Sequence, residues 1–232
     1  MTQNRQSIAF FAVDETLIAT KSMFDFLSFL GAREATLDAE TITSEMRRRS
    51  EDGEDRAAIN LRFWQSFAGL KAEAVRTCAA EWFAHQQETN PDFFIRAAVE
   101  RLRYHRSRGD VIAFVSGSAC DILEPVALHL GADHILATRL KEEDGIYTGA
   151  IEPPVMIGDG KRTSARQLAL ALDSDLADCF GYGDHLSDLP LLEIVGHPTA
   201  IGMDGDLAET ARGRGWPVLP GIETLRTEGA AA

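Results

Sequence analysis

The sequence predicts an α/β fold, a doubly wound parallel sheet with an inserted all-helical cap domain. In residues 111–219, short apolar runs alternate with amphipathic segments of helical period, which is typical of a parallel sheet covered on both faces. Before this region, residues 21–89 show helical spacing and almost no strand signal. We therefore expect a Rossmann-like core formed by residues 1–20 and 90–232, and a helical cap formed by residues 21–89.

The first elements follow from local patterns. Residues 8–13 form a continuous apolar run with polar residues behind it, which predicts a buried strand. In the cap, apolar residues recur at helical spacing, and the first helix is expected to end at Gly31. Asn90 and Pro91 suit an N-cap and a first helical position, so a helix is predicted from there to Ser107.

The later elements are expected to alternate, and the acidic turn at residues 142–145 favours one hairpin. The expected strands are residues 111–115, 135–140, 145–151, 176–182, 199–201 and 216–219, and the expected helices are residues 119–130, 161–172, 189–195 and 204–212.

Composition and charge argue against several classes of partner. Hydrophobic residues make up 45% of the 232 residues, enough for a packed core, and the formal net charge is −13. This acidity argues against nucleic acid or an anionic membrane as a partner, although a locally positive site can still bind a small anion. The apolar run at residues 8–13 is too short for a signal-peptide core or a membrane span. Three widely spaced cysteines indicate no disulfide framework, so a cytoplasmic protein is expected, with no prediction of its oligomeric state.

Carboxylates follow two of the expected strands, where ligands bind in sheets of this kind. Asp14 comes after the first strand, and Asp184 and Asp188 come after a later one. Carboxylates from separate strand ends can bind Mg²⁺, which prefers oxygen ligands. The sequence therefore predicts a Mg²⁺ site at this edge of the sheet.

A phosphate site is predicted beside these carboxylates. Ser116, Gly117 and Ser118 follow the second strand and offer a hydroxyl group, backbone N–H groups and a helix N-terminus. Lys161 begins a later helix and would neutralise phosphate charge. Together these groups would hold the phosphoryl group of a small molecule.

Four motifs in this order resemble those of phosphatases of the haloacid dehalogenase (HAD) superfamily, in the branch that includes phosphoserine phosphatase. The motifs are Asp14-Glu15-Thr16-Leu17, Val115-Ser116-Gly117-Ser118, Gly158-Asp159-Gly160-Lys161 and Gly181-Tyr182-Gly183-Asp184-His185-Leu186-Ser187-Asp188. The resemblance covers nearly the whole chain. It implies a Mg²⁺-dependent hydrolase that acts on a small phosphomonoester through an aspartyl-phosphate intermediate.

The resemblance also implies a role for each matching residue. Asp14 would protonate the leaving oxygen, activate water and offer its backbone carbonyl to Mg²⁺. Ser116 and Lys161 would hold the phosphoryl oxygens, with Gly117 beside them. The metal-binding residues that it implies are Asp14, Asp184 and Asp188, the last acting directly or through water.

Position 12 departs from the family pattern, because it holds Ala12 where the nucleophilic aspartate is expected. The presence of all the other site residues favours an engineered substitution that retains substrate without turnover. One alternative is a natural pseudoenzyme that binds a phosphorylated ligand, and another is that Glu15 has taken over the chemistry. A phosphotransferase is the alternative to a hydrolase.

The substrate is predicted from one further position. Where phosphoserine phosphatases carry a glutamate that binds the substrate ammonium, residue count places Lys21, with Ser22 beside it. A cation would repel an ammonium group, so phosphoserine is disfavoured. An anionic or hydroxylated small phosphomonoester fits better.

Two other polar features have structural interpretations. The run Arg47-Arg48-Arg49 is expected to form a solvated face of a cap helix. His185 is expected to lie in a turn and point to solvent rather than toward a substrate.

Overall fold

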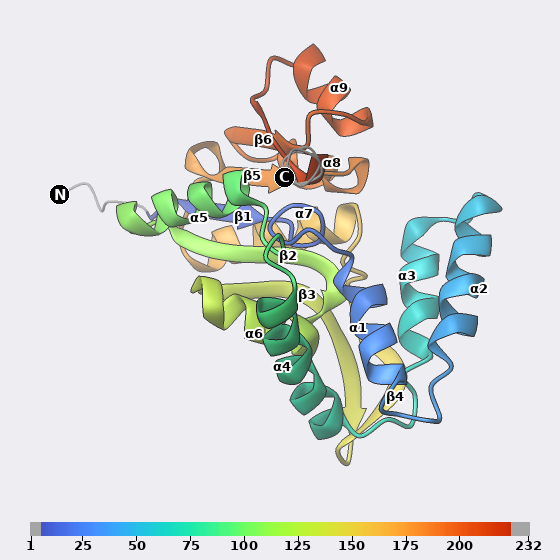
Figure 1. Cartoon of the computed structure of the whole chain (residues 1–232). Coiled ribbons are helices and arrows are strands. Elements are labelled where there is room, and N and C mark those ends of the chain that lie inside the picture. The colour runs from blue at the N-terminus through green and yellow to red at the C-terminus, as the bar shows by residue number, and fades with distance from the viewer. Residues whose placement is uncertain (1–5, 224–232) are drawn as a thin grey trace.

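The computed structural model describes residues 6–223, and a seven-stranded sheet forms its centre (Figure 1). The strand order is β4-β3-β2-β1-β5-β6-β7, and only the β3–β4 pair is antiparallel. This arrangement confirms the predicted α/β fold with its parallel sheet and its single hairpin. The strands are β1 (Ile8–Phe11), β2 (Val111–Ala119), β3 (His134–Glu143), β4 (Ile146–Glu152), β5 (Phe180–Gly183), β6 (His197–Ile201) and β7 (Val218–Leu219).

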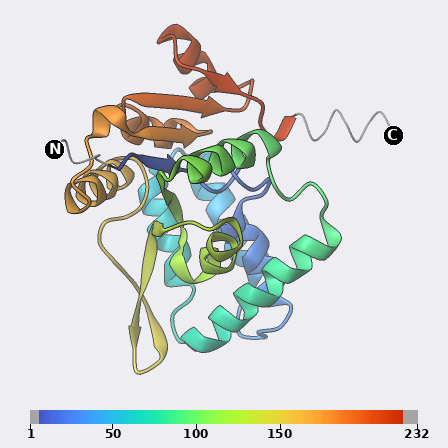
Figure 2. The same ribbon diagram turned by 90° about the vertical axis from the view of Figure 1, so that its left-hand side faces the viewer.

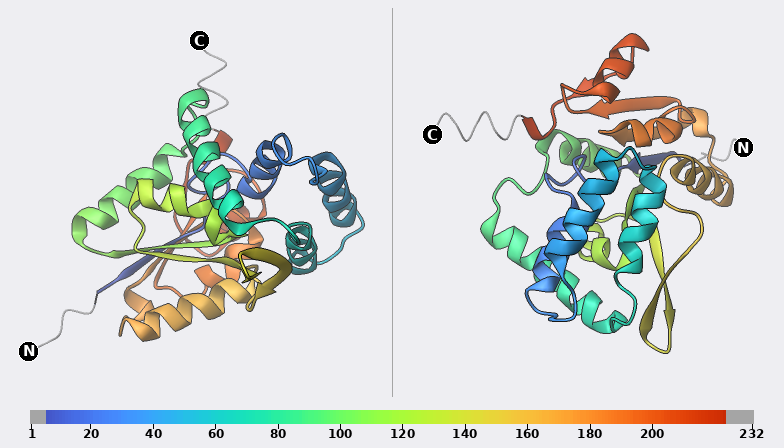
Figure 3. Two further views of the ribbon diagram at one scale, coloured as in Figure 1. Left: turned by 90° about the horizontal axis from the view of Figure 1, so that it is seen from below. Right: turned by 90° about the vertical axis from the view of Figure 1, so that its right-hand side faces the viewer.

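Both faces of the central strands are buried. Ala9 and Phe11 of β1 pack in one apolar cluster with residues of α5 and α6, whereas Ile8 and Phe10 pack with residues of α7 and α8. These helices are α5 (Arg96–Arg108) and α6 (Cys120–Leu130) on one face and α7 (Asp159–Ala171) and α8 (Leu189–Leu192) on the other (Figure 3). Burial on two sides explains why the strands are continuously apolar in sequence.

An all-helical segment separates β1 from α5. Its helices are α1 (Ser22–Gly31), α2 (Ala39–Glu51), α3 (Arg56–Gln65) and α4 (Ala72–Thr89). Asp38 and Asp55 cap α2 and α3 by accepting hydrogen bonds from backbone N–H groups of the first turn. The α2 and α3 helices lie at one side of the molecule, while α4 runs beside α6 (Figure 1). Phe26 of α1 shares an apolar cluster with Phe11 of β1, and the division into core and cap domains remains a prediction.

The β3–β4 hairpin extends beyond the rest of the sheet (Figure 2). There it pairs with the loop between α3 and α4. The N–H of Gly69 donates to the carbonyl of Tyr147 at 2.8 Å, and the N–H of Tyr147 donates to the carbonyl of Leu70 at 3.0 Å. These bonds cover part of an edge strand and fasten the helical segment to the sheet.

One predicted helix start is wrong. Residues 90–95 were expected in a helix but do not form one. Phe94 instead forms an antiparallel bridge with Ile18, and the N–H of Ile95 donates to the carbonyl of Leu17 at 2.9 Å. The backbone groups that a helix would use are therefore engaged by a distant segment, and α5 begins only at Arg96.

Most strand boundaries also differ from prediction by a few residues, and those of β1, β2 and β5 bear on the site. β1 ends at Phe11 because the chain turns at Val13, and β2 continues through residues 116–118, which were expected in a loop. Residues 176–178 form a short 3₁₀ helix, so β5 starts only at Phe180. The remaining elements are the 3₁₀ helices η1 (Leu176–Asp178) and η2 (Leu186–Asp188) and the α-helix α9 (Asp206–Gly213). Within residues 6–223 no helix is long and apolar enough to cross a membrane.

Candidate active site

A cavity of about 110 Å³ lies at the carboxyl ends of β1, β2 and β5, the edge at which parallel sheets bind ligands. Every residue predicted to belong to the site lines it, with the exception of Ser22. These residues are Ala12, Asp14, Lys21, Ser116, Gly117, Lys161, Asp184 and Asp188. The structure thus brings them together, while the role of each one stays a prediction.

Ala12 is held in place at the end of β1. Its N–H donates to the carbonyl of Tyr182 in β5 at 2.8 Å, and the residue is 2% exposed. The chain then turns tightly, with the N–H of Leu17 donating to the carbonyl of Val13 at 2.8 Å and with Glu15 at φ 55°. Such a left-handed backbone is uncommon for a residue with a side chain. The cavity wall therefore presents a methyl group at position 12, which offers no nucleophile.

Asp14 presents a half-buried carboxyl group to the cavity. Burial raises its pKa to about 6, although hydrogen bonding to Ser22 and the charge of Lys161 offset part of this effect. Its Oδ1 atom has no hydrogen-bond partner within the described part of the chain. A buried oxygen of this kind is suited to a ligand, a cation or a proton. A carboxyl group that titrates near neutral pH can also both donate and accept a proton.

The end of β2 forms another wall, which a chain of hydroxyl groups joins to α1. The N–H of Ser118 donates to Oγ of Ser116 at 3.0 Å, and the hydroxyl of Ser22 donates to Oγ of Ser118 at 2.8 Å. All three serines are buried. The predicted helix N-terminus at residues 116–118 is wrong, because β2 continues through these residues and α6 starts at Cys120.

The carbonyl of Gly117 joins the sheet to α3. It accepts hydrogen bonds from Asn60 Nδ2 at 2.9 Å, Trp64 Nε1 at 3.2 Å and Thr138 Oγ1 at 2.9 Å. A side chain at this position would be crowded, because an added Cβ would lie 2.7 Å from Cδ1 of Ile157. Trp64 was among the cap residues expected to face the substrate, whereas Asn60 was not predicted as a neighbour of the site, although its i,i+4 spacing to Trp64 places the two on one face of a helix.

Lys161, near the start of α7, forms a buried ion pair with Asp188. Its Nζ atom lies 2.5 Å from Oδ1 of Asp188, and the two side chains are 7% and 2% exposed. The second carboxylate oxygen accepts the N–H groups of Asp184 and His185, each at 3.2 Å. Asp188 therefore holds both Lys161 and the loop after β5, a pairing that was not predicted.

Asp184 connects the two loops that carry the acidic residues. The hydroxyl of Thr16 donates to its Oδ1 atom at 2.7 Å. Burial raises the pKa of Asp184 to about 7, and the negative charge of Asp188 adds to this effect. The turn after β1 and the loop after β5 are thus tied to each other beside the cavity.

The oxygen atoms at this edge fit a Mg²⁺ ion. No group of three acidic, histidine or cysteine side chains stands ready to hold a metal among residues 6–223. Mg²⁺ needs fewer, because proteins commonly bind it through one or two carboxylates while waters and phosphate oxygens complete its coordination. The carboxylate of Asp184 meets this requirement, since a nearby cation would favour its ionised form, and the backbone carbonyl of Asp14 would add a further oxygen ligand.

Two further cations line the cavity on the side of the helical segment. Lys21 lies there, as residue count predicted, with Nζ 3.5 Å from Oε2 of Glu15. Arg56, the first residue of α3, has a guanidinium nitrogen 3.0 Å from Nε2 of His185. Burial and the charge of Arg56 lower the pKa of His185. His185 is exposed, as expected, but it also lines the cavity.

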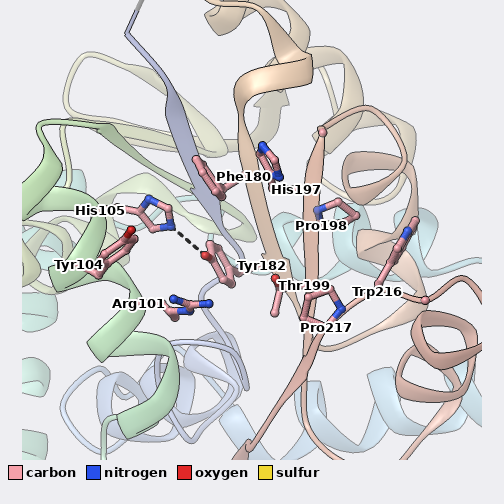
Figure 4. A pocket seen from close by; sticks show the side chains of 12 residues that line it. Arg101, Tyr104, His105, Phe180, Tyr182, His197, Pro198, Thr199, Trp216 and Pro217 are labelled. Carbon is pink, nitrogen blue, oxygen red and sulfur yellow. Dashed lines mark hydrogen bonds between the residues drawn. The ribbon is translucent and has the colours of Figure 1, made fainter.

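A larger cavity of about 350 Å³ lies between α5 and the strands β5 and β6 (Figure 4). None of the predicted site residues lines it. Nε2 of the buried His105 lies 2.8 Å from the hydroxyl of Tyr182, and Nδ1 lies 2.8 Å from Oδ2 of Asp110. Phe180 and His197, which also line this cavity, are the first residues of β5 and β6. Because ligands bind at the carboxyl ends of such strands, the smaller cavity is the candidate active site.

Known proteins resemble this chain in sequence and in fold. The family model of haloacid dehalogenase-like hydrolases matches residues 9–193. A probable phosphatase of Mycobacterium tuberculosis is 33% identical over 219 residues, which cover 92% of this chain and 75% of that protein.

Solved structures agree with this match. A protein of unknown function from Bordetella pertussis has a TM-score of 0.83 at 26% sequence identity, over 93% of this chain and 99% of that one. A substrate-bound phosphoserine phosphatase has a TM-score of 0.64 at 19% identity, over 90% of this chain and 91% of that one. At this identity the second likeness concerns the fold alone.

Proposed function

Because this chain belongs to the haloacid dehalogenase-like hydrolase family, we propose that its cavity binds the phosphoryl group of a small phosphomonoester in the manner of a Mg²⁺-dependent phosphatase. Relatives named as phosphatases support this class of activity. The observation that carries the proposal is the convergence of Asp14, Ser116 and Lys161 on one cavity at the carboxyl edge of the sheet.

Ser116 and Lys161 have hydrogen-bond donors to offer a phosphoryl group. Oγ of Ser116 accepts the N–H of Ser118, which leaves the serine hydroxyl proton for a phosphoryl oxygen. The ammonium group of Lys161 uses one direction for Asp188, and an ammonium group has three donors. The ion pair thus fixes the lysine without using up its capacity to bind an anion.

Asp14 is the proposed general acid. Because its pKa is about 6, a substantial fraction of the carboxyl groups carries a proton in mildly acidic to neutral solution. With an aspartate at position 12, as in Ala12→Asp, its carboxylate would form the bond to phosphorus, giving an aspartyl-phosphate, while the proton of Asp14 passes to the leaving oxygen as the phosphorus–oxygen bond to the leaving group breaks. The carboxylate of Asp184 and the backbone carbonyl of Asp14 would hold a Mg²⁺ ion, which when bound neutralises part of the charge on the phosphoryl group.

We further propose that Ala12 makes this chain inactive while it retains ligand binding. A methyl group cannot attack phosphorus, and the loss of one member of a catalytic unit costs several orders of magnitude in turnover. Glu15 is a poor substitute, because it pairs with Lys21. The retention of every other site residue around a methyl group is also what a natural pseudoenzyme that binds a phosphorylated ligand would show.

The deciding experiment restores the nucleophile. Ala12→Asp is assayed with an aryl phosphate and Mg²⁺, and Ala12→Asn, which has nearly the same shape and no carboxylate, is the matched control. We expect phosphate release from Ala12→Asp alone, and none in the presence of EDTA. Release that requires an added alcohol acceptor would indicate a phosphotransferase. A folded Ala12→Asp variant that stays inert across a broad panel of small phosphomonoesters would overturn the enzyme proposal.

A further inference from the structure

The candidate active site opens into a larger groove among α1, α2 and α3, with a volume of about 630 Å³. Five residues line both spaces, so the groove is continuous with the phosphate site. They are Lys21, Met23, Phe24, Arg56 and Ile157. A phosphomonoester held by Ser116 and Lys161 would extend its leaving group into this groove.

The groove has an apolar part. Met23 and Phe24 of α1, Met46 of α2 and Ile59 of α3 all line it. Phe24 contacts the ring of Phe63 edge to face, with ring centroids 5.4 Å apart, which fixes this wall against α3. A leaving group that carries a short hydrocarbon body would bury apolar surface here.

The three arginines of the run in α2 differ in their ion-pair partners. Arg48 pairs with Asp52 at 3.1 Å, and Arg49 pairs with Glu54 at 2.8 Å. Arg47 is exposed at the border of the groove and has no carboxylate partner within residues 6–223. Arg47 and Arg48 are exposed, as expected of a solvated face, and Arg47 also borders the groove.

Arg56 is the second guanidinium group in the groove. Its only hydrogen-bonding contact in the described part of the chain is with His185, so its charge is not matched by an acid. Two acids do line the groove. Asp25 is engaged by the indole N–H of Trp82 at 2.7 Å, and Glu51 is exposed. Three cations, with Lys21, thus face two acids in a protein whose net charge is −13.

We propose that the groove selects a leaving group with an apolar body and a second anionic group, a carboxylate or a phosphate, which Arg47 and Arg56 bind. Guanidinium groups suit both anions because they form paired, charge-assisted hydrogen bonds with them. This inference rests on the proposed function, since it places the phosphoryl group of the same ligand at Ser116 and Lys161. It also gives a reason why an acidic protein keeps two unpaired arginines beside its site.

The test compares three ligands that share one hydrocarbon chain. They are an n-alkyl phosphate, the same chain ending in a carboxylate, and the same chain ending in a second phosphate. Affinities are measured by titration calorimetry with Mg²⁺ on this chain, because Ala12 prevents consumption of the ligand. We expect one or both of the doubly anionic ligands to bind about tenfold more tightly than the alkyl phosphate, and the tighter of the two identifies the anion.

Arg47→Gln and Arg56→Gln should each lower that preference several-fold, and the double variant should abolish it. Arg48→Gln is the matched control, because it removes the same charge from the neighbouring residue of α2, and it should leave the preference intact. An alkyl phosphate that binds with no added preference for a second anion would overturn the inference and leave the proposed function standing. An equal loss of this preference in Arg48→Gln and Arg47→Gln would also overturn the inference and leave the proposed function standing. If none of the three ligands binds, the proposed phosphate site fails as well.

Discussion

The buried ion pair between Lys161 and Asp188 predicts a large loss of stability when its positive charge is removed. Lys161→Met keeps the length of the side chain but leaves the carboxylate of Asp188 without a cation, and Asp188 is 1% exposed. Breaking one partner of a buried pair costs about 3–5 kcal/mol in free energy of unfolding. The N–H groups of Asp184 and His185 still reach Oδ2 of Asp188, so we expect the lower end of this range, about 3 kcal/mol.

The assay is urea denaturation at neutral pH in the presence of EDTA, followed by tryptophan fluorescence. Arg48→Met is the matched control, because the Arg48–Asp52 pair has similar chemistry but side chains that are 66% and 63% exposed. Exposed pairs contribute about 0–1 kcal/mol, so this variant should be close to the parent chain. If Lys161→Met lost no more than Arg48→Met, the buried pair would not stabilise the fold and the reasoning would be refuted.

Two further predictions concern the walls of the cavity. The folded-state pKa of Asp14 is raised from 3.8 to about 6, so its protonated form stabilises the fold below pH 3.8 and this contribution is lost as the pH rises through 6. Asp14→Asn should therefore stabilise the metal-free protein by up to about 3 kcal/mol at pH 7.5 and should have no effect on stability near pH 3.5. Urea denaturation at the two pH values measures this difference, and equal effects at both would contradict the prediction. Gly117→Ala places a Cβ 2.7 Å from Cδ1 of Ile157. Thermal denaturation should therefore show a loss of about 1–2 kcal/mol in stability, and calorimetry should show weaker binding of an alkyl phosphate. Unchanged binding would show that Ile157 can move aside.

Elements with a strong local pattern were predictable from the sequence. β1 and β2 are continuously apolar because both of their faces are buried, and the β3–β4 hairpin has a turn at Asp144 and Gly145. The start of α5 was not predictable in this way. Asn90 and Pro91 have the local chemistry of a helix start, but the bridge between Ile18 and Phe94 engages the backbone that follows. A contact between segments this distant in sequence has no local signal.

Site residues were likewise predictable where a local pattern marks them and not predictable where only tertiary packing places them. Asp14, Ser116 and Asp184 were predictable because ligands bind at the carboxyl ends of parallel strands, and each residue follows such a strand or ends it. Arg56 and Asn60 were not, since α3 reaches the cavity only through packing of the helical segment against the sheet. Helical spacing shows that two residues share a face, but it does not show which surface that face meets.

The carboxyl groups around position 12 explain why the site can form with a methyl group there. The raised pKa values of Asp14 and Asp184 show that their ionised forms are disfavoured by burial and by neighbouring carboxylates, even with Lys161 nearby. An aspartate at position 12 would add another carboxylate to this cavity, and its repulsion would be relieved only by a bound cation or a proton. Ala12 adds no such charge, and the Lys161–Asp188 pair, which lies on other elements, is formed beside it. If the proposed role of position 12 holds, an alanine there would lack the reacting group and would also reduce the repulsion of an incoming phosphate dianion, which is the behaviour expected of a site that binds its ligand without turnover.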